Sequence, residues 1–360
     1  MKTLTRYLGR EVLAAILLIF TALVMLFAFF DLIKELGDVG RGDYTVSTAL
    51  LFVMLQLPSR MYELFPVAAL IGTLFALAQL VANSEYTVMR ASGASLGQVA
   101  WSLVRIGIPL ALVTFLAGEF VAPPAEWLAQ KVRAQAKGDA TRVVAQQFRS
   151  GFWFKQDLSF VNIRSVLPNM TLVGIAIYEF DNEFRLRTVR NAESGSFTGN
   201  GTWRLTAVKA TEISTTAIKV TTSDNWMWET VLRPSLLTVY QVAPERLELN
   251  TLWENMQVLG AGAQKTTRFE IAFWNKIFFP ATVIVMMILA LPFSYFQRRQ
   301  GGIGFRIFAG TMLGLSFFLV GRLFSNLGVL NNWPPLFSAV FPLVVFVALT
   351  MTLLWWLERR

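Results

Sequence analysis

Long apolar runs, separated by short polar connectors, fill both ends of this chain. Val12 to Phe30 and Ile277 to Phe296 contain no charged residue, and both reach the roughly 18 residues that distinguish a membrane span from a buried helix. The sequence therefore predicts three membrane-spanning helices before a long polar insert and three after it. We expect these spans at about 12–33, 64–82, 96–121, 273–296, 307–324 and 336–357.

The polar insert, about 131–267, has a strand pattern instead. Its β-branched and aromatic runs are short, and turn residues such as Asn200-Gly201 separate them, which is a strong hairpin signal. Predicted strands cover 152–155, 159–166, 172–180, 184–190, 202–212, 217–222 and 226–229. The predicted fold class is a membrane α-helical protein with six transmembrane helices (3+3) and an inserted antiparallel, jelly-roll-like β domain. The expected domains are 1–130, 131–267 and 268–360.

Prolines and charges interrupt two of the predicted spans. Pro58, Arg60 and Glu63 break the apolar run before the second span; we interpret 47–57 as a helix extension at the membrane interface with a kink at a proline. A charged pair inside the membrane is the alternative. Pro123 and Pro124 are expected to end the third helix, because proline cannot continue the backbone hydrogen bonding.

Composition supports a membrane protein and excludes several kinds of catalytic site. Of the 360 residues, 54% are hydrophobic and only 15% are charged, against about 25% charged in soluble domains. The chain has no Cys and no His, which excludes thiolate and imidazole metal sites and Ser-His-Asp triads. It also lacks nucleotide-binding glycine loops. We therefore assign no catalytic residue, metal or cofactor to this chain, and if it performs energy-driven work, another subunit must hydrolyse the nucleotide.

The distribution of charge predicts the topology. Basic residues outnumber acidic ones in the segments expected inside, and the reverse holds for the first outer loop, so both termini are expected in the cytoplasm and the insert outside. The net charge of +9 is explained by topology and lipid headgroups rather than by nucleic acid. The inner basic residues are Lys2, Arg6, Arg10, Arg90, Arg105, Arg298, Arg299, Arg306, Arg359 and Arg360.

The connector SEYTVMRASG, residues 84–93, looks like a short amphipathic helix that ends at Gly93. Such a helix would present Glu85 and Arg90 to the cytoplasm. It could dock into a cleft of a soluble ATPase, with Glu85 pairing a basic residue there and Tyr86, Val88 or Met89 filling the groove. The alternative is a loop that only turns the chain.

Several long segments carry a resemblance to a known family. They are SEYTVMRASG, FPVAALIGTLFALAQL, GEFVAPP with the following VRAQA, and WNKIFFPATVIVMMILALPF. Together they resemble the lipopolysaccharide export permease family, and look more like its paralogue lettered G than the other one. The resemblance implies a transmembrane subunit of an ABC transporter in the inner membrane of a Gram-negative bacterium, acting in outer-membrane biogenesis.

The resemblance also implies partners and a function. A paralogous permease, a cytoplasmic ATPase dimer, a periplasmic bridge protein and a single-helix regulatory subunit are the expected partners. Lipopolysaccharide would be extracted from the inner membrane and passed to periplasmic β domains. Glu85 matches the family's coupling position, while Lys34 and Arg133 match basic positions proposed to meet lipid A phosphates. Arg41 and Arg142 fit that chemistry without a family match. The alternative for Lys34 is a lysine that only extends to the membrane interface.

Small and aromatic residues suggest a helix-packing face. Gly310, Gly314 and Gly321 form a stripe that lets another helix approach closely. A permanent helix pair would explain it, and the resemblance implies a lateral gate against the paralogue. Four phenylalanines are candidates for lining an acyl-chain cavity, although lipid-facing aromatics look identical: Phe27, Phe30, Phe317 and Phe318. In the insert, Trp153, Phe154, Phe160 and Ile163 are candidates to face inward.

Two other functions stay open on the sequence alone. One is a membrane-anchored enzyme, since the insert holds carboxylates that could hydrolyse glycosides, although most of them lie at predicted turns. The other is a structural adaptor with an extracytoplasmic β domain.

Overall fold

The computed structural model describes residues 2–93, 95–137, 151–167, 170–199, 201–214, 217–230, 232, 243–261, 265–296 and 303–359. Its helices are α1 (Lys2–Leu36), α2 (Val46–Ala82), α3 (Glu85–Ala91), α4 (Leu96–Leu116), the π-helical η1 (Ala117–Val121), α5 (Ala122–Ala136), the 3-10 helix η3 (Pro244–Arg246), α7 (Leu249–Ala261), α8 (Thr267–Phe296), α9 (Ile303–Asn331) and α10 (Pro335–Glu358). Its strands are β1 (Phe152–Gln156), β2 (Ser159–Val166), β3 (Leu172–Phe180), β4 (Leu186–Gly199), β5 (Thr202–Ile213) and β6 (Ile218–Glu229).

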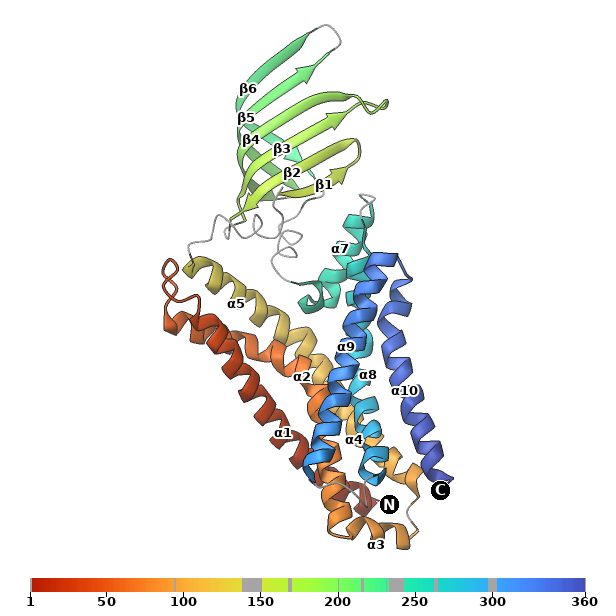
Figure 1. Ribbon diagram of the computed structural model, residues 1–360. Helices are drawn as coiled ribbons and strands as arrows, with labels where there is room; N and C mark the ends of the chain where they lie inside the picture. The colour runs from red at the N-terminus through yellow and green to blue at the C-terminus, as the bar shows by residue number, and fades with distance from the viewer. Residues whose placement is uncertain are drawn as a thin grey trace. The chain divides into compact units, whose positions relative to one another are not determined.

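Among the residues that the structure describes, six helical segments are long and apolar enough to cross a membrane. They lie in two sets of three, before and after the strands (Figure 1), which confirms the predicted fold class of a membrane helical protein with an inserted antiparallel β domain. By their contacts, the residues divide into two compact units. The first holds Met1–Ile33, Gln56–Ala125 and Glu270–Arg360, and the second holds Lys34–Leu55 and Glu126–Phe269.

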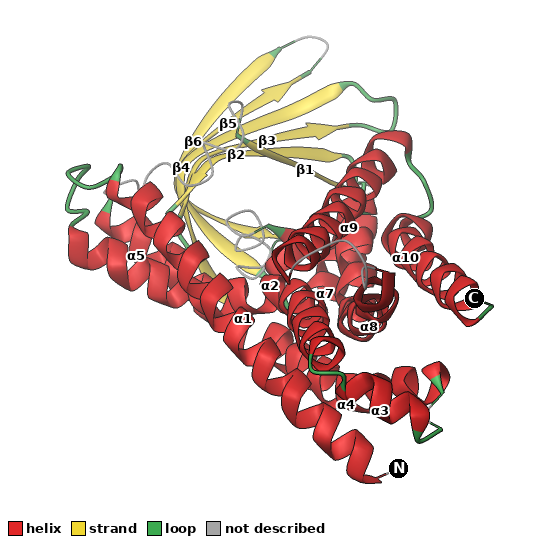
Figure 2. Ribbon diagram, turned by 60° about the horizontal axis from the view of Figure 1, so that its bottom comes forward, coloured by secondary structure: helices red, strands yellow, loops and turns green. Residues whose placement is uncertain are grey.

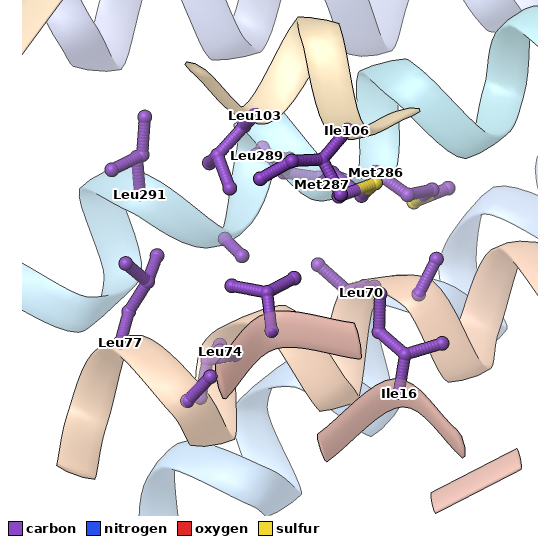
Figure 3. Packing of buried hydrophobic residues seen from close by; sticks show 14 of the residues in the cluster. Ile16, Leu70, Leu74, Leu77, Leu103, Ile106, Met286, Met287, Leu289 and Leu291 are labelled. Carbon is purple, nitrogen blue, oxygen red and sulfur yellow. The ribbon is translucent and has the colours of Figure 1, made fainter. Parts of the chain in front are cut away.

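The core of the first unit joins helices from both halves of the sequence. Leu70, Leu74 and Leu77 of α2 meet residues of α4 and α8, among them Leu103 and Met287, and all five are buried (Figure 3). Elsewhere in this unit α9 and α10 lie side by side (Figures 1 and 2). Because apolar burial is shared between the two halves, the insertion of the β domain does not divide this helical core.

A glycine lets α1 and α2 approach each other closely. A Cβ atom on Gly72 of α2 would lie only 2.5 Å from the Cα of Ile16 in α1, a distance that a side chain does not tolerate. Small residues at such positions are what allows two membrane helices to bring their backbones together.

The prediction that Pro123 and Pro124 end the third span is wrong. The helix continues from α4 through the π-helical segment η1 into α5. Both prolines lie in the first turn of α5, where a missing backbone N–H costs little because the π-helical turn has already changed the hydrogen-bond pattern. The second span is likewise a single helix, α2, that contains both Pro58 and Pro66.

The second unit contains one antiparallel sheet whose spatial order, β1 to β6, is also its sequence order. The sheet is strongly curved (Figures 1 and 2). One face carries a buried apolar cluster that includes Ile163, Ile175, Leu205 and Trp203. The Trp203 indole N–H donates a hydrogen bond of 2.8 Å to the carbonyl oxygen of Leu232. Because side chains alternate between the two faces along each strand, the apolar residues gather on this face and form the core of the unit.

The strand predictions agree in place with β1 to β5 but differ in two details. The two strands predicted at 217–222 and 226–229 form one long strand, β6, and β4 runs on to Gly199. Helix α7 was missed, since its sequence was read as part of the insert and its linker. Phe154 and Ile163 face the apolar cluster as expected, whereas Trp153 is 47% and Phe160 36% exposed, because neighbouring strand residues point to opposite faces.

Candidate functional site

Three cations converge on one carboxylate in the second unit. Asp38 lies in the turn that follows α1, where its Oδ2 accepts from Lys137 Nζ at 2.5 Å and from Arg133 Nη2 at 3.1 Å. Its Oδ1 accepts from Arg41 Nη1 at 2.9 Å. Since Arg133 belongs to α5 and Lys137 follows it directly, the cluster fastens the end of α5 to the turn after α1. We call these four residues and Glu35 the basic cluster.

Glu35 is the second carboxylate of the basic cluster and is the more firmly held. Its Oε1 lies 3.2 Å from Arg133 Nη2, and its Oε2 accepts a hydrogen bond of 2.9 Å from the Tyr44 hydroxyl. The Glu35 side chain is 6% exposed and that of Asp38 is 20% exposed. Glu35 is therefore a fixed anchor in α1, whereas Asp38 is a more accessible partner in a turn.

Aromatic rings lie close to two of the cations, Arg133 and Lys137. The Arg133 guanidinium lies 5.0 Å from the centre of the Phe52 ring, and the Lys137 ammonium lies 5.0 Å from the centre of the Tyr44 ring. Ring faces attract cations at this distance, so these contacts keep both groups in place without neutralising their charge.

The contacts of the basic cluster shift the pKa of Asp38 and that of the neighbouring Tyr44. The hydrogen bond from Lys137, and after it that from Arg133, lowers the pKa of Asp38 against the opposing effect of burial. Burial, together with the hydrogen bond to Glu35, raises the pKa of Tyr44 above its usual range. Asp38 is therefore an anion and Tyr44 a neutral donor at neutral pH.

Lys34 and Arg41 are more exposed than Arg133. Lys34, one residue before Glu35 in α1, is exposed, and the Arg41 side chain is 74% exposed. Arg142 lies outside the described residues. The structure thus brings Arg133 and Arg41 together on Asp38, and it adds Lys137, which the sequence reasoning did not select.

The apolar candidates divide into exposed and buried residues. Phe27 and Phe30 of α1 are 38% and 56% exposed. Phe317 of α9 is 8% exposed and packs edge-on against Phe346 of α10 at 5.1 Å between ring centres, with Phe318 beside it at 6.0 Å. In this chain Phe317 therefore packs in the helical core, and its role in lining an acyl-chain cavity stays a prediction.

The glycine stripe of α9 faces its own chain over most of its length. A Cβ atom on Gly310 would lie 3.3 Å from Leu74, and one on Gly314 would lie 3.2 Å from Val67, both in α2. A Cβ atom on Gly321 would have no neighbour within 4 Å. The close approach that Gly310 and Gly314 allow is thus to α2, and it explains them without a second subunit.

The short helix α3 presents the candidate coupling residue. Glu85 accepts a hydrogen bond of 2.6 Å from the Tyr7 hydroxyl of α1 and one of 3.4 Å from the Asn83 amide. Met89 packs against the helical core. The side chains of Tyr86 and Arg90 lie outside what the structure describes. Glu85 is therefore positioned by α1 at the start of α3.

Two charged groups inside the helical unit were not selected from the sequence. Lys276 Nζ of α8 lies 2.8 Å from Glu119 Oε2 of the π-helical segment, and these side chains are 5% and 13% exposed. Arg60 of α2 donates to Asp31 at 2.7 and 2.9 Å and to Glu63 at 3.1 Å. Arg60 and Glu63 are the charged residues that interrupt the apolar run before the second predicted span, and the structure adds Asp31 as a second partner of Arg60. The signal for both was a charged residue within a membrane-length apolar helix.

Comparison with known proteins decides the family. Residues 6–356 match the family model described as lipopolysaccharide export system permease LptF/LptG. The chain belongs to this family. Membership makes the chain a transport component rather than an enzyme, and with its apolar helices the chain is a multi-pass membrane protein. The match also confirms the resemblance carried by the sequence segments.

Similarity to individual members of the permease family extends over the whole chain. It is 32% identical over 359 residues to the lipopolysaccharide export system permease protein LptG of Haemophilus influenzae, covering 99% of this chain and 98% of that protein. It is 33% identical over 360 residues to LptG of Escherichia coli strain K12, with the same coverage. The E. coli K12 protein LptF is 24% identical over 364 residues, covering 98% of this chain and 94% of that protein.

Proposed function

We propose that this chain is the transmembrane permease subunit of an ATP-driven exporter that extracts lipopolysaccharide from the inner membrane and passes it to a periplasmic β-domain bridge. The observation that carries the proposal is the basic cluster, in which Arg41, Arg133 and Lys137 meet beside the end of a membrane-length helix. Lipid A phosphates are anionic and lie at headgroup depth, where Arg and Lys offer charge-assisted hydrogen bonds.

The proposed assembly pairs this chain with a paralogous permease above a cytoplasmic ATPase dimer, which binds ATP and Mg. A periplasmic bridge protein and a single-helix subunit complete it. The relatives named LptG and LptF support the existence of two paralogues. In this topology both termini and α3 are cytoplasmic, and the sheet and the basic cluster are periplasmic. Glu85 would then meet the ATPase, and Lys34 and Arg133 the lipid.

The proposal is tested by lipopolysaccharide binding to the assembled complex in nanodiscs. Arg133→Ala combined with Lys137→Ala removes two of the three cations, and we expect the dissociation constant to rise by at least roughly tenfold, since hydrogen bonds to charged groups contribute about 1.5–3 kcal/mol each. The matched control is Arg187→Ala in β4, an exposed arginine of the sheet. Equal binding by the double variant and the control would refute the proposed role of the cluster.

A further inference from the structure

The cations of the basic cluster already face an internal carboxylate, that of Asp38. Arg41, Arg133 and Lys137 provide three positive charges, and Glu35 and Asp38 provide two negative ones. A binding site made only to attract an anion would not need Asp38, which uses both of its oxygens on the same donors that a ligand would need.

We propose that Asp38 is a displaceable internal counter-ion that holds the place of a ligand phosphomonoester in the basic cluster and returns to the cations as that ligand leaves. This inference rests on the proposed function and concerns how the same site binds and releases its cargo.

The two carboxylates differ in the way that this role requires. Glu35 is part of helix α1, is 6% exposed and also accepts from Tyr44, so moving it would break a buried hydrogen bond. Asp38 lies in a turn whose backbone bonds are local, from its own N–H to Glu35 and from the Arg41 N–H to its carbonyl. Its side chain is 20% exposed. Asp38 can therefore move out into solvent while Glu35 stays in place.

A phosphomonoester satisfies the donors better than Asp38 does. Asp38 Oδ2 serves both Arg133 and Lys137, and Oδ1 serves Arg41. A phosphomonoester has three free acceptor oxygens and about −1.5 to −2 charges at neutral pH, so each cation gains an oxygen of its own. A phosphodiester has two free oxygens and a single charge, and it offers the cations no advantage over a carboxylate.

An internal carboxylate that competes for the cations is useful to a transporter when the ligand must be released. If phosphate left the cluster with no substitute, Arg133 and Lys137 would remain partly buried beside aromatic rings with too few anionic partners, which is unfavourable. Asp38 removes that penalty by returning as the ligand departs. The expected cost is weaker binding, and the expected gain is faster dissociation.

The test uses the assembled complex in nanodiscs and compares Asp38→Asn with Asp43→Asn. Asp43 is an exposed residue of the same turn region, and its substitution changes the net charge equally. With lipopolysaccharide as ligand, we expect Asp38→Asn to lower the dissociation constant by roughly tenfold and to slow dissociation, while Asp43→Asn matches wild type. Equal or weaker binding by Asp38→Asn would overturn the proposal.

Two further arms identify the phosphate source. Phosphatidic acid carries a phosphomonoester on a phospholipid, and phosphatidylglycerol carries a phosphodiester. Competition by phosphatidic acid but not by phosphatidylglycerol would assign the site to phosphomonoesters of either lipid. Competition by neither would assign it to lipopolysaccharide. Phosphatidylglycerol competing as well as phosphatidic acid would overturn the phosphomonoester assignment.

A measurement on the wild-type protein covers the case in which Asp38→Asn does not fold. Displacement of Asp38 should loosen the turn, so amide hydrogen exchange over residues 37–45 should become faster when lipopolysaccharide binds. Slower or unchanged exchange there would contradict the displacement. If the wild-type complex shows no saturable lipopolysaccharide binding, the proposed function itself fails, which is distinguishable from a bound complex in which Asp38→Asn has no effect.

Discussion

Lys276 and Glu119 form a buried ion pair in the helical unit, and we expect the stability of the chain to depend on both partners. The pair joins α8, from the second half of the sequence, to the π-helical segment in the first half. Beside it, a Cβ atom on Gly118 would lie 2.2 Å from the Tyr62 ring, so the segment has little room to rearrange. We therefore expect the loss of one charge to leave the other buried without its partner.

The magnitude follows from the separation and the burial. At 2.8 Å between Nζ and Oε2, an effective dielectric constant of about 20 gives an attraction of about 6 kcal/mol. Desolvation costs several kcal/mol for each ion, so the pair contributes little net stability, whereas the removal of one partner costs about 3–5 kcal/mol. We expect Lys276→Met to destabilise the chain by that amount, and Lys276→Met with Glu119→Leu to recover most of it.

The assay is the free energy of unfolding of the solubilised chain, followed by tryptophan fluorescence. The matched control is Arg268→Met, which removes the exposed pair with Glu245 at 3.8 Å and should cost less than about 1 kcal/mol. If Lys276→Met costs no more than this control, or if the double variant costs the sum of its two single substitutions, the pair does not act as a buried coupled unit and the reasoning is refuted.

Two further predictions concern packing and pH. Gly72→Ala should destabilise the chain by more than about 1 kcal/mol, because the new methyl group meets the backbone of α1 at Ile16, whereas Gly97→Ala, at an exposed site, should be neutral or stabilising; thermal unfolding of both variants checks this. The pKa of Asp38 is lowered by folding, so its contribution to stability is present above the ordinary Asp pKa of about 4 and is lost as the pH falls through the lower folded value. Asp38→Asn should flatten the pH dependence of stability in that acidic window, which unfolding measured at a series of pH values checks.

The spans were predictable because membrane length and lack of charge leave few alternatives for an apolar run. The helix continuing through Pro123 and Pro124 was not, since a proline ends or starts a helix depending on the turn before it, and nothing in the local sequence marks the π-helical segment. The long strand β6 was divided in the prediction because Asp224 and Asn225 resemble turn residues, but pairing with β5 overrides that preference.

The site was predictable only in part. Arg133 and Arg41 were selected by residue type and resemblance, and the structure places both on Asp38. Their shared carboxylate could not be found in advance, because residues 38 and 133 meet only through the packing of α5 against the turn after α1. Lys137 was missed for the same reason.

The most direct test of the account is ATP-driven release of labelled lipopolysaccharide from nanodiscs that contain this chain, its paralogue and the ATPase, with a soluble periplasmic acceptor. The account predicts release that requires ATP, that is abolished by Glu85→Ala with loss of ATPase association, and that persists in Glu11→Ala, an exposed acidic residue of α1. Absence of ATP-dependent release by the folded wild-type complex, or full release by Glu85→Ala, would contradict it.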